Sequence, residues 1–299
     1  MIDVRRLRLL AELSRRGTIT AVADALAYTP SAVSQQLAAL EREAGVPLLE
    51  RTGRRVVLSP AGAVLARYAQ SVFAVLEEAS AALAATRSSL AGPLRIGAFS
   101  TAARTILPPA LVALGHDHPA LDLRVTELDP VSVPGALRTG ALDVALTFAY
   151  DYVPTEPDPA LDTEPLLEEA VYLATADPAR TSIGDCREAG WIAGSPDTLC
   201  HALVVRACQA GGFTPRIRHY ADDFGAVLAL VAAGQGVSLV PELGAADAPP
   251  GVTLTALTSR RRTSIACRKG TRHHPVVSAF AEAIREPATR YLTSRPAWE

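Results

Sequence analysis

The sequence predicts an α/β protein with a helix-rich N-terminal head, a long connecting helix and a larger body. Three observations support this fold class. Apolar residues recur at helical spacing through the first 44 residues, positions 61–88 contain no proline and a single glycine, and apolar runs alternate with amphipathic segments after position 91. At 299 residues the chain is also too long for one ordinary domain.

Composition and charge narrow the class of protein. Hydrophobic residues make up 49% of the chain, which is typical of a globular protein and excludes a disordered one. Residues 1–90 carry eleven Arg, no Lys and eight acidic residues, although the whole chain has a formal net charge of -2. A basic head on an acidic body fits a head that binds a polyanion. No CxxC pair, signal peptide or membrane span is visible, so we expect a cytoplasmic protein without membrane contact.

The head is predicted to contain three helices. The first ends near Gly17, Thr18 or Thr20 caps the second, and Thr29-Pro30 begins the third. Two short helices joined by a few residues are typical of a helix-turn-helix, and small polar residues on the outer face of the second can bond base edges or phosphates. The candidate DNA contacts on this helix are Thr29, Pro30, Ser31, Ser34 and Gln35. A helical bundle with solvated Ser and Gln remains the alternative.

A basic hairpin follows the three helices. Two short apolar runs flank the turn at Thr52-Gly53, and the tip carries Arg51, Arg54 and Arg55. Arginine suits phosphates or a narrow minor groove. The order of three helices and a basic hairpin indicates a winged helix-turn-helix that binds double-stranded DNA.

The segment from Ser59 to Ser88 is predicted to be one long helix. About 30 residues of helix would extend roughly 45 Å, far more than a small head needs. A long exposed helix with an apolar seam usually pairs with another helix, although it could also pack against its own chain. The seam that would form a dimer contact contains Leu65, Val72, Leu76 and Leu83.

The head and linker resemble the winged helix-turn-helix of LysR-type transcriptional regulators. The residues that carry this resemblance are Gly17, Thr20, Ala23, Leu26, Ala32, Val33, Ser34, Leu37, Leu40, Glu41, Gly45, Leu48, Arg51, Leu58, Pro60, Ala61 and Gly62. The chain departs from the family pattern at Thr18-Ile19, where Ser-Phe is usual, and at Leu48-Leu49, where Leu-Phe is usual. Both departures affect packing more than DNA contact.

The resemblance continues in the body, at Leu94–Gly97, Leu142–Leu146 and Ala232–Val237. It implies two Rossmann-like lobes, as in type 2 periplasmic solute-binding proteins, and a homodimer or homotetramer that contacts RNA polymerase if it is an activator. The implied domains are 1–58 for DNA binding, 59–91 for the linker and 92–299 for effector binding. Within the last of these, lobe I would contain 92–163 and 268–299, and lobe II 164–267.

Alternating strands and helices in the body predict largely parallel sheets. The predicted strands are 94–99, 121–127, 144–149, 171–175, 191–193, 217–220, 237–240, 252–257 and 264–268. The predicted helices are 102–117, 132–139, 198–211, 223–233 and 276–286.

Ligands in such folds bind beyond the carboxyl ends of strands and at helix N-termini. Free N–H groups and hydroxyls there suit a small anion, and a carboxylate could bind an amine, so we expect an anionic or zwitterionic effector. Each residue could instead be an ordinary helix cap. The candidate effector-binding residues are Ser100, Thr101, Asp129, Thr147, Phe148, Ser195, Thr198 and Asp222.

Enzymatic and cofactor motifs are missing from the sequence. It contains no Walker loop, no GxSxG and no HExxH, and its six His have no metal-ligand spacing with Cys. We therefore predict no enzymatic activity, no cofactor and no metal site.

Two other hypotheses remain open. The chain could be a cytoplasmic solute-binding or interaction module whose head does not bind DNA. It could also be a redox sensor, because some LysR-type members sense peroxide through a cysteine pair in this region. However, Cys200 and Cys208 would lie roughly 12 Å apart along a helix, whereas a disulfide needs Cα atoms within about 7 Å.

Overall fold

The computed structural model describes residues 1–52, 55–87 and 89–293, without the side chains of Arg51, Thr52, Arg55 and Leu292. Its backbone contacts divide the chain into two compact units. The first contains residues 1–84 with Lys269–Thr271, and the second contains the other described residues. Each unit has a hydrophobic core of its own.

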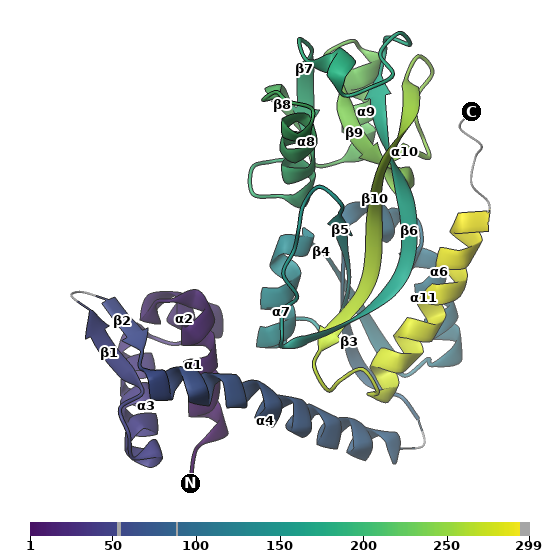
Figure 1. Ribbon diagram of the computed structural model, residues 1–299. Helices are drawn as coiled ribbons and strands as arrows, with labels where there is room; N and C mark the ends of the chain where they lie inside the picture. Colours follow the sequence, from purple (N-terminus) through teal and green to yellow (C-terminus); the bar gives the residue numbers. More distant parts are fainter. Residues whose placement is uncertain (53–54, 88, 294–299) are drawn as a thin grey trace. The chain divides into compact units, whose positions relative to one another are not determined.

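The first unit contains the three helices and the hairpin that the sequence predicts (Figure 1). The hydroxyls of Thr18 and Thr29 cap the second and third helices, and Gly17 and Gly45 end the first and third with φ of +73° and +71°. These elements are α1 (Val4–Arg16), α2 (Ile19–Leu26), α3 (Pro30–Ala44), β1 (Leu49–Thr52) and β2 (Arg55–Leu58).

A 26-residue helix, α4 (Pro60–Ala85), follows the hairpin. The hydroxyl of Ser59 accepts a hydrogen bond from the N–H of Gly62 at 3.0 Å and so caps the helix. Leu65, which the sequence places in the dimer seam, is half-buried against the core of its own head. The other three seam residues, Val72, Leu76 and Leu83, are exposed.

The second unit is built on a six-stranded sheet in the order β4-β3-β5-β10-β6-β9. Only β3–β4 and β3–β5 pair in parallel, so the prediction of largely parallel sheets was wrong: the sheet is mixed. The reason is that two long strands cross it in opposite directions. The strands are β3 (Gly92–Ala98), β4 (Leu121–Glu127), β5 (Val144–Tyr150), β6 (Leu161–Thr175), β9 (Ser238–Pro241) and β10 (Thr253–Arg268).

Strand β10 was expected as two strands, 252–257 and 264–268, but it is continuous. The three consecutive arginines between the two expected strands look like a solvated turn in the sequence. In the structure their backbones continue the ladder with β6, with Arg261 opposite Glu169. Because side chains alternate along a strand, Arg261 points inward while Arg262 is exposed.

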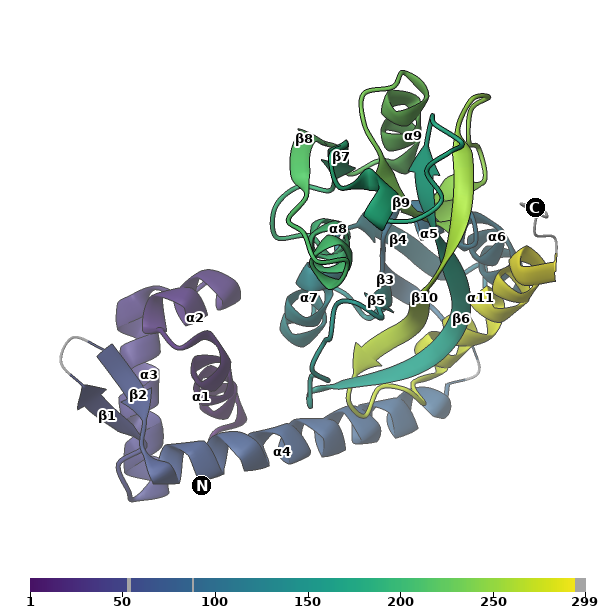
Figure 2. The same ribbon diagram turned by 45° about the horizontal axis from the view of Figure 1, so that its top comes forward.

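Helices cover both faces of the sheet. On β5, Val144, Leu146 and Phe148 join the core cluster that includes α6 and α11, whereas Ala145 packs with α7 on the other face (Figures 1 and 2). The helices are α5 (Ser100–Arg104), α6 (Leu107–Asp117), α7 (Val133–Thr139), α8 (Leu199–Ala210), α9 (Phe224–Ala232), α10 (Glu242–Ala245) and α11 (Pro275–Thr293).

The expected single helix 102–117 is divided into α5 and α6. Pro108 and Pro109 lie in the first turn of α6. A proline ring clashes with the carbonyl four residues earlier, so these two prolines disfavour a continuous helix through Arg104 and Thr105. A smaller parallel sheet pairs β7 (Gly190–Ala193) with β8 (Arg216–Tyr220).

Candidate functional site

The exposed face of α3 carries the polar residues that the sequence selects for DNA contact. Ser31, Ser34 and Gln35 are exposed, while Val33 and Leu37 on the opposite face are buried in the head core. Thr29 and Pro30 are also exposed at the start of the helix. The hydroxyl of Thr29 accepts from the N–H of Ala32 at 3.2 Å, so this side chain acts as the cap.

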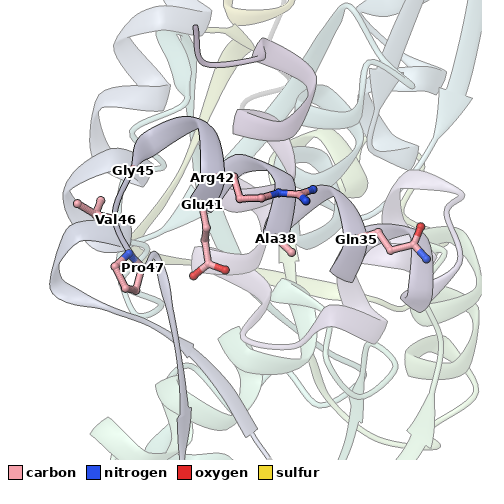
Figure 3. A pocket seen from close by; sticks show the side chains of 7 residues that line it. All are labelled: Gln35, Ala38, Glu41, Arg42, Gly45, Val46 and Pro47. Atoms are coloured by element: carbon pink, nitrogen blue, oxygen red, sulfur yellow. The ribbon is translucent and has the colours of Figure 1, made fainter.

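An open hollow of about 850 Å³ continues this face toward the turn after α3 (Figure 3). Gln35, Ala38 and Arg42 lie along the helix at one edge of it. Glu41, which also lines it, accepts from the N–H of Leu48 and of Leu49 at 2.8 and 3.0 Å and so ties the hairpin to α3. The exposed Arg42 was not selected from the sequence, although its spacing from Gln35 and Ala38 places it on the same helix face.

The arginines of the hairpin tip can be placed only in part. The backbones of Arg51 and Arg55 form the β1–β2 ladder, opposite Val56 and Thr52. Arg54 and the side chains of Arg51 and Arg55 lie outside the described residues.

A cavity of about 210 Å³ lies in the second unit, and six of the eight predicted effector residues line it. We call it the cleft cavity. Thr147 does not line it, because Phe148, the next residue on β5, points into it and alternate residues face opposite sides. Ser195 does not line it either, and its hydroxyl donates a hydrogen bond to Asp222 at 2.6 Å. The lining residues are Phe99, Ser100, Thr101, Glu127, Leu128, Asp129, Pro130, Phe148, Thr198, Cys200, Asp222, Phe224 and Arg261.

Arg261 is one of the lining residues that the sequence did not indicate as an effector contact. Its side chain is only 1% exposed, and its guanidinium carbon lies 4.8 and 4.9 Å from the ring centroids of Phe99 and Phe148. Its Nε donates to Glu169 at 2.7 Å and its Nη2 donates to the hydroxyl of Thr101 at 3.0 Å. The available signal was the middle position of three arginines within an extended segment, where alternation separates it from its neighbours.

Glu169 balances the charge of Arg261. Burial raises the pKa of the Glu169 carboxyl, while Arg261 and the N–H of Leu243 oppose that rise. That N–H donates to Glu169 at 2.6 Å. The buried guanidinium is therefore already neutralised before any ligand binds.

Carboxylates make the remaining charge of the cleft cavity negative. Burial raises the pKa of Asp129, and the nearby charge of Asp222 adds to this rise, while backbone N–H groups of Val131 and Leu199 lower it. Asp222 accepts from the N–H of Ser195 at 2.7 Å. Among the described residues, no basic side chain pairs with Asp129 or Asp222. Ser100 and Thr101 are the first two residues of α5, but this helix has only five residues, so its dipole is small.

The cysteines are free thiols. Burial is the main reason that the pKa of Cys200 rises to about 11 and that of Cys208 to about 12. The hydroxyl of Tyr150 lies 3.7 Å from the sulfur of Cys200. The described residues include no group of side chains suited to a metal ion. In the same residues, no helix has the length and apolarity needed to cross a membrane.

A winged helix-turn-helix head joined to an α/β body with an internal cavity defines a DNA-binding transcriptional regulator with a ligand-binding domain. The chain belongs to the LysR family of bacterial regulators. Residues 4–63 match the family model for the bacterial regulatory helix-turn-helix protein, lysR family, and residues 87–288 match that for the LysR substrate binding domain. Members of this family are transcriptional regulators and not enzymes.

Known proteins similar to this chain include two kinds of regulator. A probable hydrogen peroxide-inducible genes activator of Mycobacterium xenopi is 38% identical over 56% of this chain and 86% of that protein. The HTH-type transcriptional regulator GltR of Bacillus subtilis is 28% identical over 95% of this chain and 97% of that protein. The solved structure of a Corynebacterium glutamicum OxyR C206 mutant is 26% identical, with a TM-score of 0.59 over 98% of this chain and 93% of that one.

Proposed function

We propose that this LysR-type regulator controls transcription in response to a small anionic or zwitterionic effector that binds in the cleft cavity. It would act in the cytoplasm as a homodimer or homotetramer, and it would contact RNA polymerase if it is an activator. The observation that supports DNA binding most directly is the exposed polar face of α3, with Ser31, Ser34 and Gln35 above a buried apolar face.

In this proposal α3 and the hairpin of the head have different roles. Ser34 and Gln35 on α3 would contact base edges in the major groove. A glutamine amide can form two hydrogen bonds with one base, and a serine hydroxyl can form one. Arg54 and Arg55 on the hairpin would contact phosphates or the minor groove, and would contribute affinity rather than sequence preference. Ligand binding in the cleft cavity would then change how the subunits sit on the operator.

Replacing Arg54 and Arg55 by Ala is expected to weaken binding to all DNA sequences. The dependence of log affinity on log salt should flatten by about one unit for each phosphate that the protein no longer binds, because fewer counterions are released. Fluorescence anisotropy with DNA from upstream of the gene that encodes the protein, at several salt concentrations, would measure both quantities.

Arg67→Ala serves as the control, because it removes the same kind of charge from an exposed position on α4. An unchanged slope for the Arg54, Arg55 variant would exclude the hairpin from the DNA interface. If the wild-type protein showed no salt-dependent DNA binding, the result would instead support the alternative of an interaction module that does not bind DNA.

A redox-sensing regulator is the second candidate function. It is favoured by the similarity to hydrogen peroxide-inducible genes activators together with the position of Cys200 in the cleft cavity. The raised pKa values of Cys200 and Cys208 argue against it, because the thiolate and not the thiol reacts.

We expect Cys200 to react slowly with oxidants and alkylating agents. A pKa of about 11 leaves roughly a hundredth of the thiolate of an ordinary cysteine at neutral pH. Mass spectrometry of iodoacetamide labelling at pH 7.5 would give the rate, with free cysteine as the reference. Fast labelling, together with a peroxide effect on DNA affinity that Cys200→Ser removes, would support redox sensing instead.

A further inference from the structure

We infer that the cleft cavity binds a small zwitterion, with its carboxylate at Arg261 and its ammonium group at Asp129 and Asp222. This inference rests on the proposed role of the cavity as the effector site, and it narrows the class of effector. The binding groups would be a guanidinium and two carboxylates that line the same cavity.

Arg261 provides the donor for the carboxylate. Its Nε and Nη2 are occupied by Glu169 and Thr101. Within residues 1–52, 55–87 and 89–293, the hydrogen bonds found for this guanidinium come from Nε and Nη2, and none comes from Nη1. The side chain is 1% exposed, lines the cavity and packs against the rings of both Phe99 and Phe148. A buried guanidinium with one unused donor is suited to a charge-assisted hydrogen bond with a ligand carboxylate.

Asp129 and Asp222 provide the acceptors for the ammonium group. They follow different strands, β4 and β8, and both line the same cavity. Their hydrogen-bond donors are neutral: the N–H groups of Val131 and Leu199 for Asp129, and the N–H and hydroxyl of Ser195 for Asp222. Two neighbouring carboxylates without a cation repel each other, so an ammonium group between them would be strongly favoured.

The balance of charge separates a zwitterion from the alternatives. Glu169 already neutralises Arg261, so a simple anion would enter a cavity in which Asp129 and Asp222 are uncompensated. A simple amine would leave Nη1 of Arg261 unused. A ligand with both a carboxylate and an ammonium group is complementary to Arg261 and to the two aspartates.

The size and apolar lining of the cavity narrow the ligand further. Its volume of about 210 Å³ lies below the range of roughly 300–1,000 Å³ that is typical of drug-sized ligands. Leu128 and three phenylalanines, Phe99, Phe148 and Phe224, supply apolar surface. An α-amino acid with a small apolar side chain fits this combination.

The test uses matched sets of probes on the full-length protein. L-Alanine, L-valine and L-leucine would each be compared by calorimetry and thermal shift with the acid that lacks the amine and the amine that lacks the carboxylate. For leucine these are 4-methylpentanoate and 3-methylbutylamine. At least one amino acid should bind about tenfold or more tightly than both of its partners, because each partner loses a charged hydrogen bond.

Three variants assign the groups. Asp129→Asn and Asp222→Asn should each weaken amino acid binding about tenfold or more and should strengthen binding of the matched acid, because they remove negative charge. Asp223→Asn is the control, since Asp223 adjoins Asp222 in sequence but does not line the cavity. If the substitutions only disturbed the structure, binding of the amino acid and of the matched acid would weaken to the same extent.

Each outcome decides the inference. Tighter binding of an acid or an amine than of every amino acid, or binding by none of the probes, would show that the zwitterion assignment is wrong. Intact DNA binding in the salt titration would then leave the proposed regulator in place. Amino acid binding by a protein that does not bind DNA would instead overturn the proposed function and keep the ligand class.

Discussion

Replacing Arg261 by Met is expected to lower the free energy of unfolding by about 3–5 kcal/mol, because it leaves the charge of Glu169 buried without a partner. The two side chains are 1% and 0% exposed and lie opposite each other on β10 and β6. Urea denaturation followed by circular dichroism would measure the decrease.

The decrease should depend on pH in a defined direction. Burial raises the pKa of the Glu169 carboxyl, and removing Arg261 takes away the charge that opposes this rise. A carboxyl whose pKa is higher in the folded than in the unfolded state destabilises the fold above the unfolded value, and this effect disappears as the pH falls. The difference from wild type should therefore be larger at pH 7.5 than at pH 5.

Two further variants separate charge from packing. Adding Glu169→Gln to Arg261→Met should recover most of the stability, because the amide oxygen can still accept from the N–H of Leu243 while the buried charge is gone. Arg262→Met should have little effect, because Arg262 is exposed and its ion pairs are solvated. If the double variant were as unstable as the single one, poorer packing against Phe99 and Phe148 would be the cause.

Replacing Leu76 by Asp is expected to break the proposed homodimer. Leu76 is 49% exposed on α4 and belongs to a run of exposed apolar side chains along that helix. In a dimer contact the new carboxylate would be buried, at a cost of roughly 3 kcal/mol or more, or about a hundredfold in the dimer dissociation constant. The run contains Val64, Tyr68, Val72, Val75, Leu76 and Leu83.

Light scattering across a range of concentrations would measure this change. Val112→Asp is the control, because Val112 is a 75% exposed valine on α6 of the other unit. Leu65→Asp would be expected to destabilise the head instead, since Leu65 packs against the head core. A Leu76→Asp protein that stays dimeric would place the interface on another surface.

The head could be predicted from the sequence almost element by element, because its signals are local. Thr29 and Pro30 mark the start of α3, Gly45 marks its end, and the spacing of Val33 and Leu37 defines its buried face. Caps and periodicity act within a few residues of the chain, so they are visible without any tertiary contact. The exposed polar face with Ser34 and Gln35 follows from the same spacing.

The cleft cavity could be predicted only in part. Thr101, Asp129 and Phe148 follow from the rule that ligands bind beyond strand ends. The same rule selects Thr147, because the sequence indicates that a strand ends there but not which face each side chain takes. The sequence predicts Ser195 as a ligand contact, whereas in the structure its hydroxyl donates a hydrogen bond to Asp222.

The sequence by itself determined the family, the order of elements in the head and the polar face of α3, because these depend on local patterns and a long motif. Only the tertiary structure decided that β10 is continuous, that Arg261 packs against Phe99 and Phe148, and that Glu169 neutralises it. Arg261 and Glu169 are 92 residues apart in the chain. Their pairing depends on the register between two long strands, and no local pattern carries that register.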